Sequence, residues 1–562
     1  MASTDSRRSS SLVAAGILLS RVFGLVRGRV FAHYFGTGAI ADAFNAALRI
    51  PNLLQNLLGE GVLSGSFIPV YARLVEDRDQ EEAGALAGAI AGLLAVLSGV
   101  LVIVGVLLAG PITDLLALGF SGLRRDLTES LVRIMFPGMG LLVLSAWCLG
   151  ILNSHRQFFL SYVAPVLWNL AQIIALIAFG LRGTTGDDLA IVLGWSVVAG
   201  SALQFAVQLP AVLRLVPSLR LSVDRGRSSV RKVLAAFLPI VTGRGVVQLM
   251  AYVDLAIASF LAIGAVSALG YAQTLYLLPV GLFGMAVAAA ELPELSRAKP
   301  GELDVVGDRL ENGLARIAFF VVGSVLVFVL LGDLLIGTLF GSGQFGTDDI
   351  KLVWLVLIGY SLGLIGTTSS RLYQSVLYGM GEAKLPARAA AVRVTFSAIL
   401  GLLLMLQLDR IVIDASGALG STGGLPAFTP LPAQIRENPL LPKHLGAVGL
   451  AVAAGLSAWI ETWILRRRLR VDLGRDVPPG GGHLARSLGA AAVAVPVALV
   501  ARLLVADLPA LIALGLAVGA TGVTYVATAS ALGVPEAAHF VAMVRRRLPA
   551  RADAPEHEPS DD

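Results

Sequence analysis

Apolar runs long enough to cross a lipid bilayer recur along the whole chain, and they constrain its fold more than any other feature. A helical span needs about 20 mostly apolar residues, and the runs at 90–110, 136–153, 318–338, 353–369 and 508–531 meet or approach that length. Of the 562 residues, 56% are hydrophobic and only 14% are charged, whereas a soluble domain normally carries about a quarter charged residues. The chain is therefore predicted to be an all-α integral membrane protein.

About fourteen transmembrane helices are predicted from these runs. Several predicted helices are longer than a bilayer requires, which indicates tilt or extension beyond it. The predicted ranges are 10–35, 38–72, 82–117, 125–154, 158–181, 187–215, 229–262, 265–297, 304–340, 347–379, 385–407, 445–468, 484–505 and 508–531.

An internal repeat predicts how these helices are grouped. The segment GAIADAFNAALRIPNLL from Gly38 is echoed by GAVSALGYAQTLYLLP from Gly264, and a second echo has nearly the same offset. An even number of spans per repeat leaves both halves in the same orientation, as in many secondary transporters. We expect two six-helix parallel repeats plus two C-terminal helices. The predicted divisions are an N-terminal half at 1–220, helices 7–11 with a long loop at 221–444, helices 12–14 at 445–531, and an amphipathic segment with a tail at 532–562.

The basic residues of the loops predict which side of the membrane each loop faces. Lys and Arg collect in cytoplasmic loops, and alternate loops are rich in them, with Arg225 before the seventh helix and Arg467 at the end of the twelfth. Both termini are therefore predicted to be cytoplasmic. The Gly- and Pro-rich segment 408–444 is then extracytoplasmic. It is either a functional lid or, as we favour, a tolerated insertion.

Ionisable residues inside the predicted spans mark the candidate site. A charge at bilayer depth is costly, so it usually faces a cavity or a partner. Unpaired arginines suit an anionic substrate, because a guanidinium binds phosphate oxygens bidentately. The alternative is snorkelling, or pairing with Asp42 and Asp254. The candidate substrate-binding residues among them are Arg21, Arg27, Asp42, Glu60, Arg244 and Asp254.

Other functional classes have little support in the sequence. A net charge of +5 is what cytoplasmic loops produce, so no nucleic-acid partner is expected. One cysteine, Cys148, gives no thiolate metal site, and neither a metal nor a cofactor is expected. The chain lacks the phosphate-binding loop, the HExxH helix and the nucleophile elbow of common enzyme classes. The interpretation is a transporter, not an enzyme, and active transport would have to use an ion gradient or the membrane potential.

The segment SRVFGLVRGRVFAHYFGTGAIADAFNAALRIPNLLQNLLGEGVLSGSFIPVYARL at 20–74 resembles the N-terminal signature of the MurJ/MviN lipid II flippase family. The resemblance implies the multidrug/oligosaccharidyl-lipid/polysaccharide exporter fold in the bacterial inner membrane. It implies that an undecaprenyl-pyrophosphate-linked peptidoglycan precursor is flipped to the outer leaflet by alternating access. A cationic cavity would hold the pyrophosphate and sugars. A groove at the last two helices would hold the lipid tail. Arg21 and Arg27 match two family cavity arginines, and Asp42 and Glu60 match acidic positions. The expected partners are this lipid-linked anion and the bilayer, and a monomer is expected.

The chain departs from the family pattern at several charged positions. A family arginine is replaced by Gln55, an Asp-Arg pair by Gln273 and Thr274, and a glutamate by Leu277. Arg244 is expected to compensate from the seventh helix. Two alternatives stay open: a flippase or exporter for another polyprenyl-linked glycan, and a non-transporting membrane scaffold derived from a flippase.

Overall fold

The chain folds almost entirely into helices, which confirms the predicted all-α membrane class. A computed structural model describes residues 2–285, 303–382, 384–414 and 417–547, without the side chains of 2–15, 17, 60, 243–251 and 543–547. Its contacts divide the chain into two compact units. Unit 1 comprises Met1–Gln273, Ile336–Gly359 and Val394–Ala453, and unit 2 comprises Thr274–Leu335, Tyr360–Arg393 and Ala454–Asp562. These units do not test the repeat-based division at residues 220 and 444, which stays a prediction.

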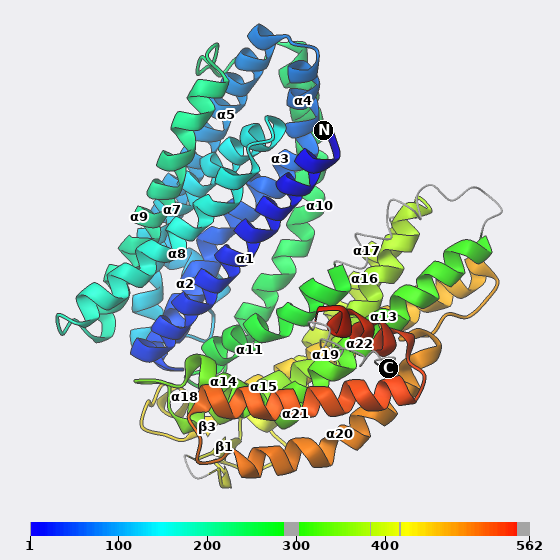
Figure 1. The fold of residues 1–562 in the computed structure, drawn as a ribbon. Helices are drawn as coiled ribbons and strands as arrows, with labels where there is room; N and C mark the ends of the chain where they lie inside the picture. The colour runs from blue at the N-terminus through cyan, green and yellow to red at the C-terminus, as the bar shows by residue number, and fades with distance from the viewer. Residues whose placement is uncertain (1, 286–302, 383, 415–416, 548–562) are drawn as a thin grey trace, which may run out of the picture. The chain divides into compact units, whose positions relative to one another are not determined.

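Unit 1 is built around helix α7, which packs against α2, α5 and α9 (Figure 1). Most of the apolar length of α7 is buried, with Leu131 and Met135 fully enclosed. Helix α1 packs along α8. The bounds are α1 Ala2–Phe35, α2 Ala39–Leu58, α3 Glu60–Ser66, α4 Ile68–Glu76, α5 Gln80–Leu107, α6 Ala109–Leu116, α7 Gly122–Ser154, α8 Phe158–Gly180, α9 Gly186–Leu215 and α10 Ser228–Ala258.

Unit 2 centres on helix α13, which packs against α16 and α20, while α20 packs against α21. The unit boundary falls inside α11, α14, α15, α17 and α19. The bounds are α11 Ala265–Pro279, a π-helical turn Val280–Met285, α13 Leu303–Leu330, α14 Gly332–Phe340, α15 Thr347–Ser361, α16 Leu364–Gly379, α17 Lys384–Leu408, α19 Gly446–Leu473, a 3-10 turn Gly481–His483, α20 Leu484–Leu504, α21 Ala510–Ala531 and α22 Pro535–Arg547.

The segment 408–444 is more ordered than a loop of its composition suggests. Its strands β1 (Ile411–Ile413), β2 (Leu419–Ser421) and β3 (Lys443–His444) form a small antiparallel sheet in the order β2-β1-β3. The short helix α18 (Ala433–Arg436) lies between β2 and β3. In unit 1 the segment is tied to the helix bundle, since the Ile263 N–H donates to the Arg436 carbonyl over 3.0 Å.

Several predicted helices are interrupted, and the breaks have local causes. The predicted range 38–72 forms three helices, α2, α3 and α4. Pro51 lies inside α2 without ending it. The break occurs at Gly59, where a Cβ would lie 2.2 Å from the Gln55 carbonyl oxygen, so only glycine fits. Pro69 occupies the first turn of α4, where its missing N–H costs no hydrogen bond.

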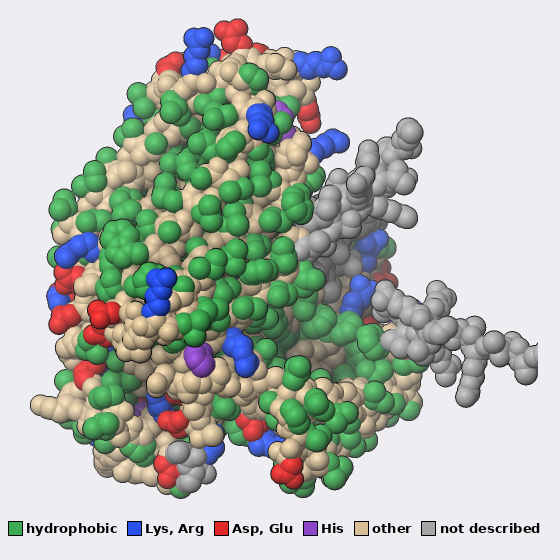
Figure 2. Space-filling model, turned by 60° about the vertical axis from the view of Figure 1, so that its left-hand side comes forward, with side chains coloured by type: hydrophobic (Ala, Val, Ile, Leu, Met, Phe, Trp, Pro, Cys, Tyr) green, Lys and Arg blue, Asp and Glu red, His purple; other side chains and the backbone are tan. Residues whose placement is uncertain are grey.

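Each of the fourteen predicted ranges is mostly helical over its described residues, but the number of membrane crossings stays a prediction. Ten of the described helices are long and apolar enough to cross a membrane, and the pair α15 and α16, bent by 44°, would make eleven. On the face drawn in Figure 2, hydrophobic side chains cover a broad area, and charged side chains gather mostly toward its upper and lower ends. This distribution is typical of a protein that contacts lipid.

Candidate functional site

Arg27 is held on α1 by two neighbours from α8. Its guanidinium lies over the Trp168 ring, 5.0 Å from the ring centroid, and donates to Gln172 Oε1 over 3.3 Å. Trp168 and Gln172 are four residues apart, so they lie on one face of α8. Within the described residues, no carboxylate pairs with Arg27. The guanidinium is therefore positioned by a ring and an amide while its charge stays uncompensated.

Arg21 and Arg29, the two other arginines of α1 whose side chains the structure describes, have different surroundings. Arg29 donates to the carbonyl oxygens of Thr338 and Leu339, at 2.5 and 3.1 Å, and so binds the last turn of α14. Cations interact favourably with a helix C-terminus, which indicates an anchoring role. Arg21 is exposed and forms no ion pair with any described side chain. Among the described side chains of α1, Arg21 and Arg27 are thus the arginines available to an anion.

Gln55 lies in the wall of a polar cavity of about 340 Å³ inside the N-terminal helices of unit 1. Helices α1, α2, α7, α8 and α9 contribute to its lining, and Trp168 belongs to this lining as well. The cavity therefore shares Trp168 with the Arg27 guanidinium. Helix α2 places Gln55 there one turn before its break at Gly59.

Asp42 is fully buried and lies in a dense polar network. Its Oδ1 accepts from the backbone N–H and hydroxyl of Ser267, at 2.8 and 2.7 Å, and its Oδ2 accepts from the Gly264 N–H over 2.8 Å. These donors surround the start of α11, so Asp42 caps the N-terminus of that helix. The Arg124 guanidinium pairs with Oδ2 over 3.3 Å. Both oxygens are occupied by the protein itself.

Arg124 completes this network, and no pattern in the sequence predicts its burial. The side chain is fully buried at the start of α7, and it lies over the Phe120 ring. It forms a bidentate pair with Glu437 of the segment 408–444, with both N···O distances at 2.7 Å. The segment that we favoured as a tolerated insertion therefore supplies a carboxylate to a buried ion network of unit 1.

The remaining predicted site residues do not join Arg21 and Arg27 in the described structure. Asp254 is exposed on α10, where it has an interaction partner within the protein. The side chains of Glu60 and Arg244 lie outside the described residues. Their predicted roles stay predictions.

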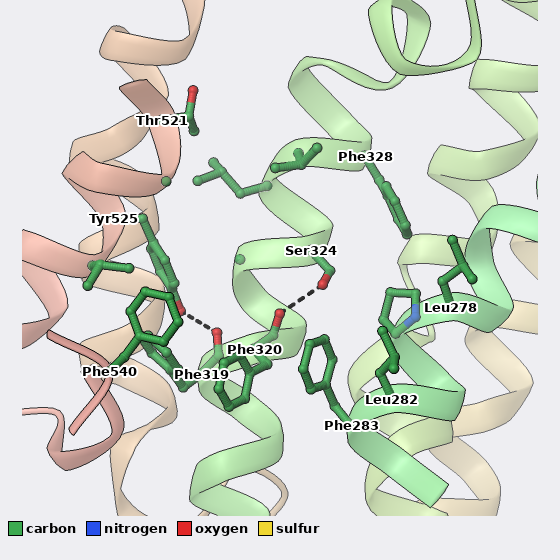
Figure 3. A pocket seen from close by; sticks show the side chains of 16 residues that line it. Leu278, Leu282, Phe283, Phe319, Phe320, Ser324, Phe328, Thr521, Tyr525 and Phe540 are labelled. Atoms are coloured by element: carbon green, nitrogen blue, oxygen red, sulfur yellow. Dashed lines mark hydrogen bonds between the residues drawn. The ribbon is translucent and has the colours of Figure 1, made fainter. Parts of the chain in front are cut away.

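An apolar pocket of about 390 Å³ lies in unit 2 between the π-helical turn, α13, α21 and α22 (Figure 3). Phe283 and Phe320 stack in parallel on one side, with centroids 4.5 Å apart. The Tyr525 hydroxyl is turned away from solvent and donates to the Phe319 carbonyl over 2.7 Å. With its polar groups satisfied internally, the pocket offers hydrocarbon and ring surfaces to a ligand.

Sequence comparison identifies the chain's relatives. The sequence model of the lipid II flippase MurJ matches residues 31–436. A probable lipid II flippase MurJ of Rhizobium tropici is 31% identical over 425 residues, which is 75% of this chain and 79% of the relative. The chain belongs to the MurJ family. A lipid II flippase MurJ of Burkholderia cenocepacia is also 31% identical, over 82% of this chain and 83% of its own length.

Two solved transporter structures share this fold. A lipid II flippase MurJ in an inward closed conformation matches with a TM-score of 0.70 over 95% of this chain and 100% of that one, at 21% identity. An inward-facing multidrug resistance MATE transporter of the MOP superfamily matches with a TM-score of 0.56 over 81% of this chain and 94% of its own, at 16% identity. This MurJ family member is a multi-pass bacterial membrane protein, and its family consists of transporters rather than enzymes.

Proposed function

We propose that this chain is a lipid II flippase, which moves undecaprenyl-pyrophosphate-linked peptidoglycan precursor from the inner to the outer leaflet by alternating access. The observation that carries the proposal is the state of Arg21 and Arg27 in a chain of this family. Within the described residues neither cation has a carboxylate partner, although an uncompensated charge within a membrane span is costly. An anionic ligand would supply the missing charge, and pyrophosphate oxygens match guanidinium geometry.

The two arginines and the apolar pocket suit different parts of such a substrate. Arg21 and Arg27 would hold the pyrophosphate, with Arg27 aimed by Trp168 and Gln172. The apolar pocket at α13 and α21 would take part of the polyprenyl tail, because hydrocarbon burial needs apolar surface and no polar partner. Asp42 is then a structural residue that caps α11. Gln55, Glu60, Arg244 and Asp254 remain the other candidate contacts.

The loop charges support a cytoplasmic position for both termini, and we propose that the protein acts as a monomer. A flippase for another polyprenyl-linked glycan would use the same arginines and the same apolar pocket. A non-transporting scaffold would have no use for an uncompensated guanidinium, so Arg27 favours a transporter over a scaffold.

The test is rescue of a bacterium depleted of its own lipid II flippase. Wild-type protein should restore growth, and Arg27→Ala should abolish rescue, because a lost charge-assisted hydrogen bond is worth about 1.5–3 kcal/mol, roughly 10- to 100-fold in rate. Arg27→Lys should rescue only partly, since an ammonium cannot bind bidentately. Arg182→Ala is the matched control, because Arg182 is an exposed arginine just beyond α8. Full rescue by Arg27→Ala at equal protein levels would contradict the substrate role.

Failure of the wild-type protein to rescue would favour one of the two alternatives. Proteoliposomes that contain fluorescent polyprenyl-pyrophosphate glycans would then separate them, because a flippase for another glycan moves a labelled lipid to the opposite leaflet and a scaffold does not.

A further inference from the structure

The segment 408–444 exposes apolar side chains on a stretch that carries no charge. Phe428 is 74% exposed and Leu425 is 57% exposed, and no residue from 417 to 435 has an ionisable side chain. We refer to residues 423–430 as the apolar tip. Exposed Leu and Phe without charges between them are typical of segments that lie in a membrane interface.

The apolar tip is fixed to the end of helix α17 by one side chain. The Gln407 carboxamide binds both backbone groups of Ala427, since its Nε2 donates to the Ala427 carbonyl over 2.5 Å and its Oε1 accepts from the Ala427 N–H over 2.9 Å. Ala427 is itself buried. This pair of hydrogen bonds holds Leu425 and Phe428 at the end of α17 with their side chains exposed.

Gln407 ends an exposed apolar stripe of α17. Ile399, Leu403 and Gln407 are four residues apart, so they lie along one face of the helix. Phe396, Ile399 and Leu403 are exposed, and little of the apolar length of α17 is covered by the rest of the protein. In a multi-pass membrane protein such a stripe contacts the hydrocarbon of the bilayer. The apolar tip therefore continues a surface that faces lipid.

A cation lies beside the apolar tip. The Arg410 guanidinium donates to the Thr429 carbonyl over 3.3 Å, and a Cβ on Gly423 would lie 2.6 Å from its Nη1. Arg410 forms no ion pair within the described part of the chain, where its Nε–H also has no hydrogen-bond partner. An arginine next to exposed apolar groups fits the head-group region, because lipid phosphates accept charge-assisted hydrogen bonds and the acyl chains below them accept apolar side chains.

We propose that the apolar tip is an interfacial anchor, which inserts Leu425 and Phe428 into the leaflet at the C-terminal end of α17 and places Arg410 at the level of the lipid phosphates. The continuity with the exposed stripe of α17 selects lipid as the occupant of this surface rather than a protein partner. The anchor goes beyond the proposed function, since it does not depend on which substrate is moved.

Fluorescence quenching in vesicles tests the anchor on the full-length chain. Single cysteines are introduced by Phe428→Cys or Leu440→Cys in a Cys148→Ser background, labelled with nitrobenzoxadiazole, and reconstituted into vesicles of phosphatidylcholine and phosphatidylglycerol. Leu440 is the matched control, because it is 89% exposed in the same segment but lies within four residues of three charged side chains. Lipids with a nitroxide near the head group quench an inserted probe, and aqueous iodide quenches a probe in water.

The probe at position 428 should be quenched by the nitroxide lipid and should lose its quenching by iodide, because interfacial segments insert about 5–10 Å into the head-group and acyl boundary. The probe at 440 should behave in the opposite way. Arg410→Gln should weaken insertion of the 428 probe about fivefold in these anionic vesicles, the effect of one basic residue near the surface. Equal iodide quenching at both positions would overturn the anchor. Shielding of 428 from iodide without nitroxide quenching would also overturn it, since protein would then cover the tip.

A second measurement avoids the dye, which can itself draw a side chain into lipid. Amide hydrogen exchange of the unlabelled chain in the same vesicles compares wild type with the double variant Leu425→Ser and Phe428→Ser, and with Leu440→Ser as the control. Exchange at the Ala427 amide should become about tenfold faster in the double variant, because burial of the two side chains in lipid is lost, and should not change in the control. Since neither side chain is buried in the protein, unchanged exchange in the double variant would refute insertion.

Discussion

At the scale of single residues, the buried ion network of Arg124 dominates unit 1. Arg124 is fully enclosed and satisfies two carboxylates, Asp42 and Glu437, as well as the Leu261 carbonyl. Removing one partner of a buried pair is strongly destabilising, because a charge is then left buried without compensation. The neighbouring Arg125 pairs with Asp114 at the exposed surface, where ion pairs contribute little.

We predict that Arg124→Gln lowers the free energy of unfolding by about 3–5 kcal/mol. Arg125→Gln, one residue away, should cause little change. Urea or thermal unfolding of both purified variants measures the difference. Equal stabilities would mean that Arg124 does not hold the segment 408–444 against the helices.

Asp409, just beyond α17, is a second buried residue whose charge state should affect the stability of the protein. Burial raises the pKa of its carboxyl to about 7, although Arg436, Arg410 and Arg124 oppose the rise. Its Oδ1 has no hydrogen-bond partner among the described residues. The neighbouring His444 binds the Asp409 carbonyl through Nδ1, and burial lowers the pKa of this imidazole.

The raised pKa of Asp409 predicts a pH-dependent stability. The folded state keeps its proton up to about pH 7, whereas an unfolded aspartate loses it near pH 3.9. Folding therefore takes up a proton between these values, and stability falls as the pH rises through this window. The Asp409→Asn variant should lack this contribution to the pH dependence, which is on the order of a few kcal/mol in the free energy of unfolding. Melting temperatures at pH 4, 5.5 and 7.5 measure it, and identical pH profiles for the two proteins would refute the assignment.

At the scale of elements, three glycines of helix α5 allow an extended loop to pack closely against the helix. Gly84, Gly88 and Gly92 lie four residues apart, so they form one face of α5, a spacing usually associated with helix pairs. Here the face holds an extended segment instead. A Cβ on Gly88 would lie 1.9 Å from the Arg220 carbonyl oxygen, and one on Gly92 would lie 2.0 Å from that of Ser222.

Gly88→Ala should therefore destabilise unit 1 by about 1–3 kcal/mol, the usual effect of overpacking, because backbone atoms of the 216–227 segment would have to move. Gly99→Ala is the control in the same helix. Its Cβ would meet nothing within 4 Å, so the better helix propensity of alanine should leave stability unchanged or slightly raised. Thermal unfolding measures both, and a neutral Gly88→Ala would contradict the close approach.

At the scale of the whole molecule, the topology is open to a direct test. The loop charges predict that Arg225 and Arg467 face the cytoplasm and Ser421 the outside. Single cysteines at these positions, in a Cys148→Ser background, should react with an impermeant maleimide from outside only at 421. Lysed cells should label all three positions, which controls for accessibility. Labelling at 225 but not at 421 would reverse the orientation.

The sequence by itself determined the fold class, the positions of the helices and the cationic helix. Apolar runs, and ionisable residues within them, are local signals, because each run of about 20 apolar residues predicts its own span. Arg21 and Arg27 could be singled out for the same reason. The break at Gly59 was not predicted, because the need for glycine there depends on the position of the Gln55 carbonyl.

Only the tertiary structure decided which polar residues are already satisfied. Asp42 and Arg124 are 82 residues apart, and Arg124 and Glu437 are 313 apart, so no spacing in the sequence predicts either pair. The polar cavity likewise requires side chains from five helices to converge. Burial and pairing are set by contacts between distant segments, and these contacts separate an anchored charge such as Asp42 from an available one such as Arg27.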